Sequence, residues 1–284
     1  MQRPKRVAAI HDLSVFGRCS LSVITPVISA MGVQVLSVPT VLMSTHTGGF
    51  SDIEFDGCDN FVSRTAHHLY KCNVEIDCIY SGYIADKTAF DGVYDFFKSF
   101  PSAKRIIDPV LGDHGRLYSA LSEEIVGYMR YLIGSADIIT PNLTEVFLLL
   151  NEPYREIVRK NDIPNIIEKL KRLTKADIVI TGVTDENNDK YNICYQNGEI
   201  SLIPCFYVHS SYEGTGDTFA SVIAGSVIKG ENLKTGIIKA SQFVEKCIDL
   251  TFDSGEPKRD GIFVESALPL LYEKNLPDRK IIKL

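Results

Sequence analysis

The fold is decided by a short stretch that joins a strand to a helix: Asp137-Ile138-Ile139-Thr140-Pro141-Asn142-Leu143-Thr144-Glu145-Val146-Phe147. Residues 137–140 are typical of a short buried strand, and residues 143–150 have a helical pattern. Between them, Asn142 followed three residues later by Glu145 is typical of a helix N-cap with its reciprocal acid. The stretch therefore predicts a β-strand that leads into an α-helix.

The same alternation of strand and helix extends over most of the chain. Extended runs are expected at 7–10, 35–42, 76–81, 105–108, 137–140 and 177–181. Helices are expected at 20–31, 60–71, 87–99, 122–132, 143–150, 163–173, 219–229, 233–250 and 264–273. Strands that alternate with helices in this way predict a three-layer α/β fold, with a mostly parallel central sheet and helices on both faces.

One segment departs from the alternation and predicts an antiparallel hairpin. Asn197-Gly198 lies between extended runs at 191–195 and 200–204, and Asn-Gly is a strong turn signal in that position. No repeat or linker divides the 284 residues. We therefore expect a single domain, residues 1–284, that ends in a loose tail at 275–284.

Composition excludes several classes of protein. A net charge of −6 argues against a general nucleic-acid binder, and no apolar run approaches the roughly 20 residues that span a bilayer. The basic N-terminus is too short and too polar for a secretory signal. The seven cysteines are scattered without a C-x-x-C pair, which fits reduced thiols. We expect a cytoplasmic protein that binds neither nucleic acid nor membrane.

The most informative chemical motif is Glu213-Gly214-Thr215-Gly216-Asp217-Thr218, which runs straight into an apolar helical pattern. Glycines allow a tight turn and close approach to a ligand, and the first amides of a helix attract phosphate. Asp217 adds a carboxylate that could accept a proton from an attacking hydroxyl. Taken alone, the motif is equally compatible with a glycine turn in which Asp217 is a favourable first-turn acid.

Other polar groups follow the predicted strands, where ligands bind in open α/β sheets. Asp108 and Asp113, on one loop, could serve a metal or a polyphosphate, or lie in a solvated turn. The pair Asn142 and Glu145 could hold water around Mg²⁺ or only cap a helix. Thr181-Gly182 could bend the chain past a nucleotide or form a simple turn.

Two further groups lie near the N-terminus. Ile10-His11-Asp12-Leu13-Ser14 is expected to end the first strand. The stretch 44–49 is rich in hydroxyl groups and glycine, and its His46 could stack on a ring or cap a loop.

Together these residues give the chain a resemblance to the pyridoxal kinases of the ribokinase-like superfamily, from Ala9 to about Phe252. The matching stretches are Ser44–Gly48, Ser81-Gly82-Tyr83, Asp108–Asp113 with Gly115 to Tyr118, Ala136–Asn142 with Glu145, and Gly214–Asp217. The resemblance implies phosphorylation of the 5′-hydroxymethyl group of pyridoxal, pyridoxine or pyridoxamine by MgATP. It also implies a monovalent cation such as K⁺ and a homodimer.

The resemblance further implies roles for individual residues. Asp217 matches the catalytic base, and Gly214-Thr215-Gly216 matches the anion hole, where Thr215 also meets ATP. Nucleotide positions are matched by Asp108, Asp113, Asn142, Glu145, Thr181 and Gly182. Metal or cation positions are matched by Asp108, Thr140 and Glu145. Thr47 and Tyr83 match vitamer-pocket positions, and Asp12 and His46 are further candidates for substrate binding.

Asp12 marks one departure from the family pattern. Counting back from Gly17 places Asp12 where pyridoxal kinases usually carry a serine that meets the pyridine ring. An ionised aspartate only accepts hydrogen bonds, so a carboxylate there would favour a donor or cation on the substrate. The sequence therefore predicts a preference for pyridoxamine over pyridoxal.

Three alternatives to a pyridoxal kinase stay open. A hydroxymethylpyrimidine kinase would share the fold and machinery, although such kinases usually carry a Gly/Ser-rich run ending in Ala-Asp that residues 11–20 lack. A sugar kinase of the superfamily fits less well, because its N-terminal sugar motif is not evident. A catalytically silent nucleotide-sensing protein is the rival of another class, against which the intact Asp217 and Glu145 argue.

Overall fold

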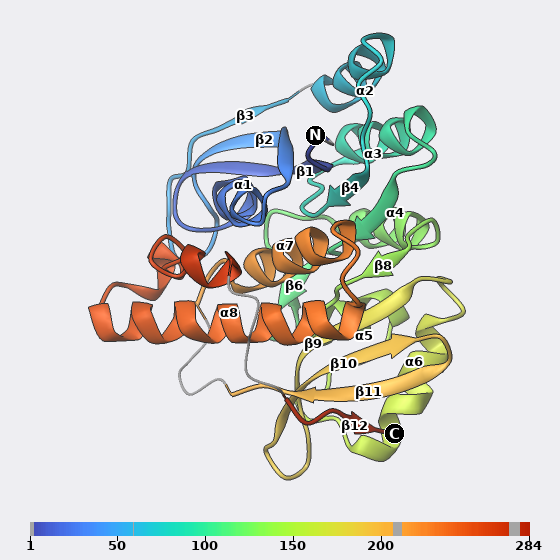
Figure 1. Cartoon of the computed structure of the whole chain (residues 1–284), viewed down its shortest axis with the longest axis vertical. Helices are drawn as coiled ribbons and strands as arrows, with labels where there is room; N and C mark the ends of the chain where they lie inside the picture. Colours follow the sequence, from blue (N-terminus) through green and yellow to red (C-terminus); the bar gives the residue numbers. More distant parts are fainter. Residues whose placement is uncertain (1–2, 59, 207–211, 273–278) are drawn as a thin grey trace. The chain divides into compact units, whose positions relative to one another are not determined.

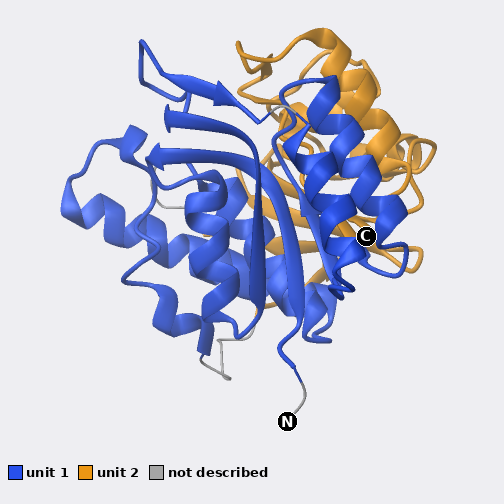
Figure 2. Cartoon of the chain, turned by 90° about the horizontal axis from the view of Figure 1, so that it is seen from above, with its two compact units in different colours: residues 1–104, 207–277 blue, residues 105–206, 278–284 orange. Residues whose placement is uncertain are grey.

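The computed structural model describes residues 3–58, 60–206, 212–272 and 279–284. The chain forms two compact units, coloured separately in Figure 2. Unit 1 consists of Met1–Lys104 and Tyr207–Pro277, and unit 2 consists of Arg105–Phe206 and Asp278–Leu284. Both units combine strands with helices, so each is an α/β structure.

The strands of unit 1 follow the order β4-β1-β2-β3. Their bounds are Arg6–Phe16 for β1, Gln34–Thr45 for β2, Phe55–Gly57 for β3 and Cys78–Ser81 for β4. β1 is parallel to β2 and β4, and β3 is antiparallel to β2. Val7, Ala8, Ala9 and Ile10 of β1 are fully buried, as expected for a central strand covered on both faces.

Unit 1 contains two groups of packed helices (Figure 1). α1 (Ser20–Ala30) packs on α7 (Thr215–Ile228), which packs on α8 (Leu233–Ser254), and α2 (Phe61–Lys71) packs on α3 (Lys87–Ser99). Two short 3₁₀ helices, η2 (Lys258–Asp260) and η3 (Leu268–Tyr272), follow α8. The starts of α1 and α7 lie together, since the Ser20 amide donates to Asp217 in the first turn of α7, and Asp217 also contacts His11 of β1.

Unit 2 has the strand order β12-β11-β10-β9-β8-β5. Its sheet strands are β5 (Lys104–Ile107), β8 (Ile138–Ile139), β9 (Asp177–Thr184), β10 (Lys190–Gln196), β11 (Glu199–Pro204) and β12 (Ile282–Lys283). β5, β8 and β9 are parallel, and the remaining pairs are antiparallel. A separate hairpin joins β6 (Gly112–Asp113) to β7 (Arg116–Leu117), and the helices are α4 (Glu123–Ile133), α5 (Leu143–Leu150), η1 (Lys160–Asp162) and α6 (Ile163–Leu170).

The expected alternation and the Asn197-Gly198 hairpin are confirmed, and three details differ. β1 continues to Phe16, because residues beyond Ile10 still pair with β2 after the pairing with β4 has ended. The helix expected at 264–273 is only the 3₁₀ turn η3, because Pro269 cannot donate a helical hydrogen bond. Of the loose tail expected at 275–284, residues 275–278 lie outside the described part of the chain, and β12 pairs with β11. No helix of the described residues has the length and apolarity needed to cross a membrane.

Candidate active site

Asp217 lies in the first turn of α7, directly after the glycine turn. Gly214 has a φ of 77°, and a Cβ at this position would lie 1.8 Å from the carbonyl oxygen of Arg18. Only glycine fits this backbone. The amide of Thr218 donates to the carbonyl of Gly214, which is the first hydrogen bond of the helix. The amides of residues 215–217 come before it and have no acceptor within the helix. These three amides can bind an anion beside Asp217.

The carboxylate of Asp217 is held between two other elements of unit 1. Its Oδ2 accepts a hydrogen bond of 2.6 Å from the backbone amide of Ser20, at the start of α1. Its Oδ1 lies 3.2 Å from Nε2 of His11, on β1. The N-cap residue of α1, Cys19, makes no side-chain cap, so Asp217 satisfies an amide that the local sequence leaves open. The Asp217 side chain remains 13% exposed, which leaves it accessible to a substrate hydroxyl.

His11 and Asp12 form a buried pair behind Asp217. Nδ1 of His11 lies 2.7 Å from Oδ1 of Asp12, and the other oxygen of Asp12 accepts from the hydroxyl of Ser14 at 3.2 Å. His11 and Asp12 are 2% and 3% exposed. Burial opposes the charged imidazole, but Asp217 and Asp12 outweigh it and raise the pKa of His11 to about 10. The contact with His11 and the hydrogen bond from the Ser20 amide together lower the pKa of Asp217 despite its burial.

The sequence indicated Asp12 but not His11 as a site residue. Both carboxylate oxygens of Asp12 have partners within the protein, His11 and Ser14, and neither partner is a substrate group. The contact between His11 and Asp217 joins residues 206 positions apart, so no local pattern could reveal it. The glycine at 82 makes room for the ring, because a Cβ there would lie 1.9 Å from Cδ2 of His11, but only the three-dimensional structure brings the two residues together.

The remaining substrate candidates also lie in unit 1. His46 is 6% exposed, and its Nδ1 accepts from the amide of Gly48 while its Nε2 lies 2.6 Å from the carbonyl of Arg259. An accepting Nδ1 requires the proton on Nε2, which donates to Arg259, so these contacts fit the loop-capping alternative. Thr47 is exposed, and Tyr83 is half-buried. Burial, Asp12 and Asp86 raise the pKa of Tyr83 to about 12, so its hydroxyl is neutral at physiological pH.

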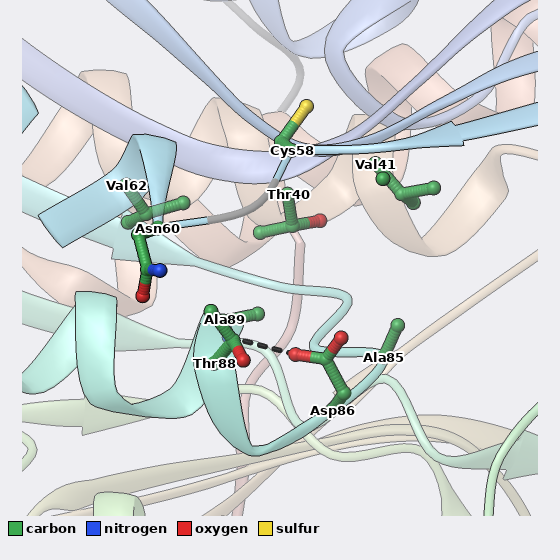
Figure 3. A pocket seen from close by; sticks show the side chains of 10 residues that line it. Thr40, Val41, Cys58, Asn60, Val62, Ala85, Asp86, Thr88 and Ala89 are labelled. Atoms are coloured by element: carbon green, nitrogen blue, oxygen red, sulfur yellow. Dashed lines mark hydrogen bonds between the residues drawn. The ribbon is translucent and has the colours of Figure 1, made fainter. Parts of the chain in front are cut away.

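Unit 1 also contains a cavity near Tyr83, whose backbone carbonyl accepts from the hydroxyl of the lining residue Thr40 at 3.2 Å (Figure 3). Its lining includes Thr40, Cys58, Asn60 and Asp86, where Asp86 caps α3 by accepting from the amide of Ala89. The cavity measures about 60 Å³, whereas pockets for small ligands usually measure roughly 300–1,000 Å³. It can hold a few waters but not a substituted aromatic ring.

Unit 2 brings together the acidic residues that the sequence places after β5 and β8. Asp108 is 6% exposed, and its Oδ1 accepts from the hydroxyl of Thr140 at 3.0 Å. Asn142 and Glu145 form the predicted capping box of α5, with bonds of 3.0 and 2.7 Å. The second oxygen of Glu145 accepts from the amide of Leu111 at 3.2 Å. The cap is therefore confirmed, and it does not exclude a second role for Glu145.

The other nucleotide candidates lie beside this cluster or at its edge. Thr181 pairs with Asn142 in an isolated bridge and donates its amide to the carbonyl of Pro141. The amide of Gly182 donates to the side chain of Asn192 at 3.0 Å. Asp113 lies on the β6–β7 hairpin, and its side chain is 46% exposed. The amides of Thr181 and Gly182 are thus hydrogen-bonded within the protein, whereas the carboxylate of Asp113 is open to solvent.

The donor set of unit 2 fits a magnesium ion that keeps most of its own water. Burial raises the pKa of Glu145 well above its usual range, and the charges of Asp108 and Asp113 add to this despite two backbone donors. A cation beside these carboxylates would relieve that repulsion. Among the described residues, however, no three His, Cys, Asp or Glu side chains are grouped closely enough to ligate a metal directly. Mg²⁺ bound through one or two carboxylates and several waters matches this arrangement.

The comparisons with known proteins agree with this architecture. A Bacteroides thetaiotaomicron protein that carries the name of a phosphomethylpyrimidine kinase, in a crystal form with pyridoxal, is 36% identical with a TM-score of 0.93, covering 99% of this chain and 100% of that one. Pyridoxal kinase from Lactobacillus plantarum is 29% identical with a TM-score of 0.87, covering 95% and 97%. Pyridoxal kinase from Leishmania donovani, solved with ADP and ginkgotoxin, has the same fold, with a TM-score of 0.84 at 22% identity over 99% of both chains.

These likenesses confirm the resemblance and the kinase class that the sequence indicated. The sequence model of the family described as phosphomethylpyrimidine kinase matches residues 26–260, which is most of the chain. The match includes the acidic cluster of unit 2 and the glycine turn with Asp217, and it leaves out β1, the start of α1 and the residues after 260. The chain therefore belongs to the phosphomethylpyrimidine kinase family of ribokinase-like kinases.

Proposed function

We propose that the protein transfers the γ-phosphoryl group of ATP to the 5′-hydroxymethyl group of a vitamin B6 vitamer. The observation that carries the proposal is the geometry of Asp217, a partly exposed carboxylate at a helix N-terminus whose two oxygens are held by Ser20 and His11. The 36% identical relative with pyridoxal in its crystal supports the substrate class. The two compact units would act as one kinase domain, in which each unit serves one substrate.

Unit 1 would bind and activate the alcohol. Asp217 accepts the hydrogen bond of the hydroxyl group and takes its proton as the bond from oxygen to phosphorus forms. Because the pKa of Asp217 is lowered, its carboxylate stays ionised and orients the hydroxyl rather than acting as a strong base. The amides of Gly214-Thr215-Gly216 and the start of α7 stabilise the negative charge on the transferred group. Thr47 and Tyr83 would contact the vitamer, and His46 would order the loop that carries Thr47.

Unit 2 would bind the nucleotide. Asn142, Thr181, Gly182 and Asp113 would contact ATP, while Asp108, Thr140 and Glu145 would hold Mg²⁺ and K⁺ through oxygen ligands and water. When bound, Mg²⁺ supplies charge neutralisation of the phosphate oxygens. Glu145 keeps its own orientation through the amides of Asn142 and Leu111.

The test is phosphate transfer by the purified full chain with MgATP and K⁺. Pyridoxal, pyridoxine, pyridoxamine and hydroxymethylpyrimidine are each offered as acceptor, and products are identified by mass spectrometry. We expect a 5′-phosphate on at least one vitamer and none in reactions without acceptor. Transfer to no vitamer by folded protein that binds ATP would refute the proposal, and would favour a nucleotide-sensing role.

Hydroxymethylpyrimidine phosphorylation is the second candidate, because the matching family is described by a pyrimidine substrate. The two rings differ in size and in their nitrogen positions, but both present a hydroxymethyl group to the same base. A kcat/KM for hydroxymethylpyrimidine above that for every vitamer would make it the better description.

We also propose that the enzyme works as a homodimer in the cytoplasm. A group of large apolar side chains is exposed where β1 ends and β3 begins. Val15 is 82% exposed, Phe16 is 52% exposed and Phe55 is 69% exposed. Apolar groups gathered at one sheet end are typical of an interface. All seven cysteines are free thiols, which suits a reducing compartment. Light scattering should give twice the chain mass for the wild type and a smaller mass for Phe55→Asp, and an unchanged mass would remove this surface from the interface.

A further inference from the structure

We propose that His11 is a positioning residue that holds the Asp217 carboxylate for phosphoryl transfer, and that Asp12 acts on the reaction by holding His11. The inference rests on the proposed function and adds two residues that no site motif of the sequence assigns to the base. It gives Asp12 a role different from contact with the substrate ring.

The contacts form a chain from Ser14 to the reacting carboxylate. Ser14 donates to Asp12, Asp12 lies 2.7 Å from Nδ1 of His11, and Nε2 of His11 lies 3.2 Å from Oδ1 of Asp217. The Ser20 amide holds the other oxygen of Asp217 at 2.6 Å. With the Ser20 amide bonded to one oxygen and the His11 ring in contact with the other, the carboxylate cannot rotate freely.

The protein makes a specific place for the imidazole ring. A Cβ at Gly82 would lie 1.9 Å from Cδ2 and 2.1 Å from Nε2 of His11, so any larger residue at 82 would displace the ring. Gly82 has an ordinary backbone conformation, because its φ is not among the positive values. The absence of a side chain at 82 is therefore needed for the ring and not for the backbone. Tyr80 closes another side, with its ring edge-on at 6.5 Å.

Charge, rather than hydrogen-bond direction, dominates the contact with Asp217. Nε2 of His11 is fully buried and makes no aligned hydrogen bond with any described residue, although Oδ1 of Asp217 is only 3.2 Å away. A protonated imidazole between two carboxylates balances one of their two charges, which stabilises all three groups. A neutral donor in its place would lose this attraction.

The titratable groups in and around the cluster of His11, Asp12 and Asp217 come from several elements. They are Asp12 on β1, Asp217 on α7, Cys19 before α1, Tyr80 on β4, Tyr83 after β4 and His46 after β2. Within the described part of the chain, the carboxylates in direct contact with the ring are those of Asp12 and Asp217.

The first test uses His11→Gln, which keeps a side-chain donor and removes the charge. We expect kcat to fall roughly tenfold to a hundredfold, the usual effect of a lost orienting contact, with little change in KM for ATP or vitamer. Because the imidazolium lowers the pKa of Asp217, the acid limb of the kcat/KM profile should move to higher pH in His11→Gln. A structural defect alone would lower the active fraction without moving that limb. An unmoved limb would overturn the proposal.

The second test displaces the ring without changing any charged residue. Gly82→Ala forces His11 from its place, whereas Gly127→Ala adds the same methyl group to a helix position with nothing within 4 Å. We expect Gly82→Ala to reproduce the kinetic changes of His11→Gln and Gly127→Ala to behave as wild type. Normal kinetics of Gly82→Ala would contradict the proposal.

The third test decides how Asp12 acts. If Asp12 works through His11, Asp12→Asn should lower kcat for every vitamer alike, and the double variant with His11→Gln should lose little more than either single variant. Additive losses, or a change in vitamer ranking that persists without His11, would assign Asp12 to the substrate ring instead.

A last measurement does not depend on turnover, so its failure is distinguishable from failure of the proposed kinase activity. In ¹⁵N-histidine NMR of the full chain, both ring nitrogens of His11 should remain protonated above pH 8, and Asp217→Asn should lower that titration point. A His11 that is neutral at pH 7, or a titration point that Asp217→Asn leaves unchanged, would overturn the coupling even in an active enzyme.

Discussion

Replacing Glu145 with glutamine separates the two roles of this residue, capping α5 and organising a metal ion. The change preserves length and shape and removes one charge. Both carboxylate oxygens are occupied, one by the amide of Asn142 at 2.7 Å and one by the amide of Leu111 at 3.2 Å. Glutamine has a single acceptor oxygen, so one of these two amides must lose its partner.

The effect on stability follows from these contacts. Leaving one buried amide unpaired costs roughly 1–3 kcal/mol. Removing the charge offsets part of this cost, because burial and the neighbours Asp108 and Asp113 already disfavour the ionised form and raise the pKa of Glu145. We expect a net loss on the order of 1 kcal/mol, which lowers Tm by roughly 2–4 °C in a chain of this size.

The effect on the metal should be larger. Without the charge of Glu145, the Mg²⁺ concentration for half-maximal rate should rise roughly tenfold to a hundredfold at saturating ATP. Asp86→Asn is the matched control, since it makes the same acid-to-amide change at the N-cap of α3, where Asp86 accepts from Ala89 at 2.8 Å. The control should leave the Mg²⁺ requirement unchanged. A Glu145→Gln enzyme with a lower Tm and a normal Mg²⁺ requirement would show that the residue only caps the helix.

Three further outcomes are expected. Asp217→Asn should retain ATP binding, measured by calorimetry, and lose roughly 10²–10⁴ in kcat, and near-normal turnover would return the residue to the role of a helix-end acid. Asp12→Ser should leave the ratio of kcat/KM for pyridoxamine and pyridoxal unchanged, and a narrowed ratio would instead support the ring contact expected from the sequence. The protonated form of His11 stabilises the folded state, because the pKa of His11 is about 10 there and its usual value is 6.5. This contribution to the free energy of unfolding is fully present below pH 6.5 and decreases as the pH rises toward 10. Urea unfolding should therefore show wild-type stability falling on the order of 3 kcal/mol between pH 6.5 and 10, with a flatter profile for His11→Gln.

Local signals in the sequence were sufficient to predict a helix or hairpin wherever capping or turn residues mark the place where it begins or turns. α3 and α5 begin after the capping residues Asp86 and Asn142, and both match their expected ranges. The hairpin of β10 and β11 turns at Asn197-Gly198 as expected. Elements defined by distant partners were harder to predict. β1 is extended by pairing with β2, and β12 exists because it pairs with β11, which no pattern in either segment reveals.

The residues of the candidate site also divide into those that local sequence signals reveal and those that depend on distant contacts. Asp217 and Glu145 could be found because each follows a recognisable turn or cap. His11 could not, since its importance depends on Asp217 in three-dimensional space and on the missing side chain of Gly82. The sequence also indicated Asp12, but not that His11 and Ser14 occupy its carboxylate.

Asp217 accepts from the first amide of α1 in addition to its proposed role as the catalytic base, and both roles would limit which residues can replace it during evolution. Ser20, whose amide it binds, is a non-glycine residue with a φ of 54°, a conformation that costs roughly 1–2 kcal/mol and relies on its surroundings. A lineage that abandoned catalysis would still need an acceptor at 217 to keep this helix start intact. In a library randomised at 217 and selected only for folding, aspartate and asparagine should therefore be enriched over alanine, and an even distribution would show that the helix tolerates an open amide.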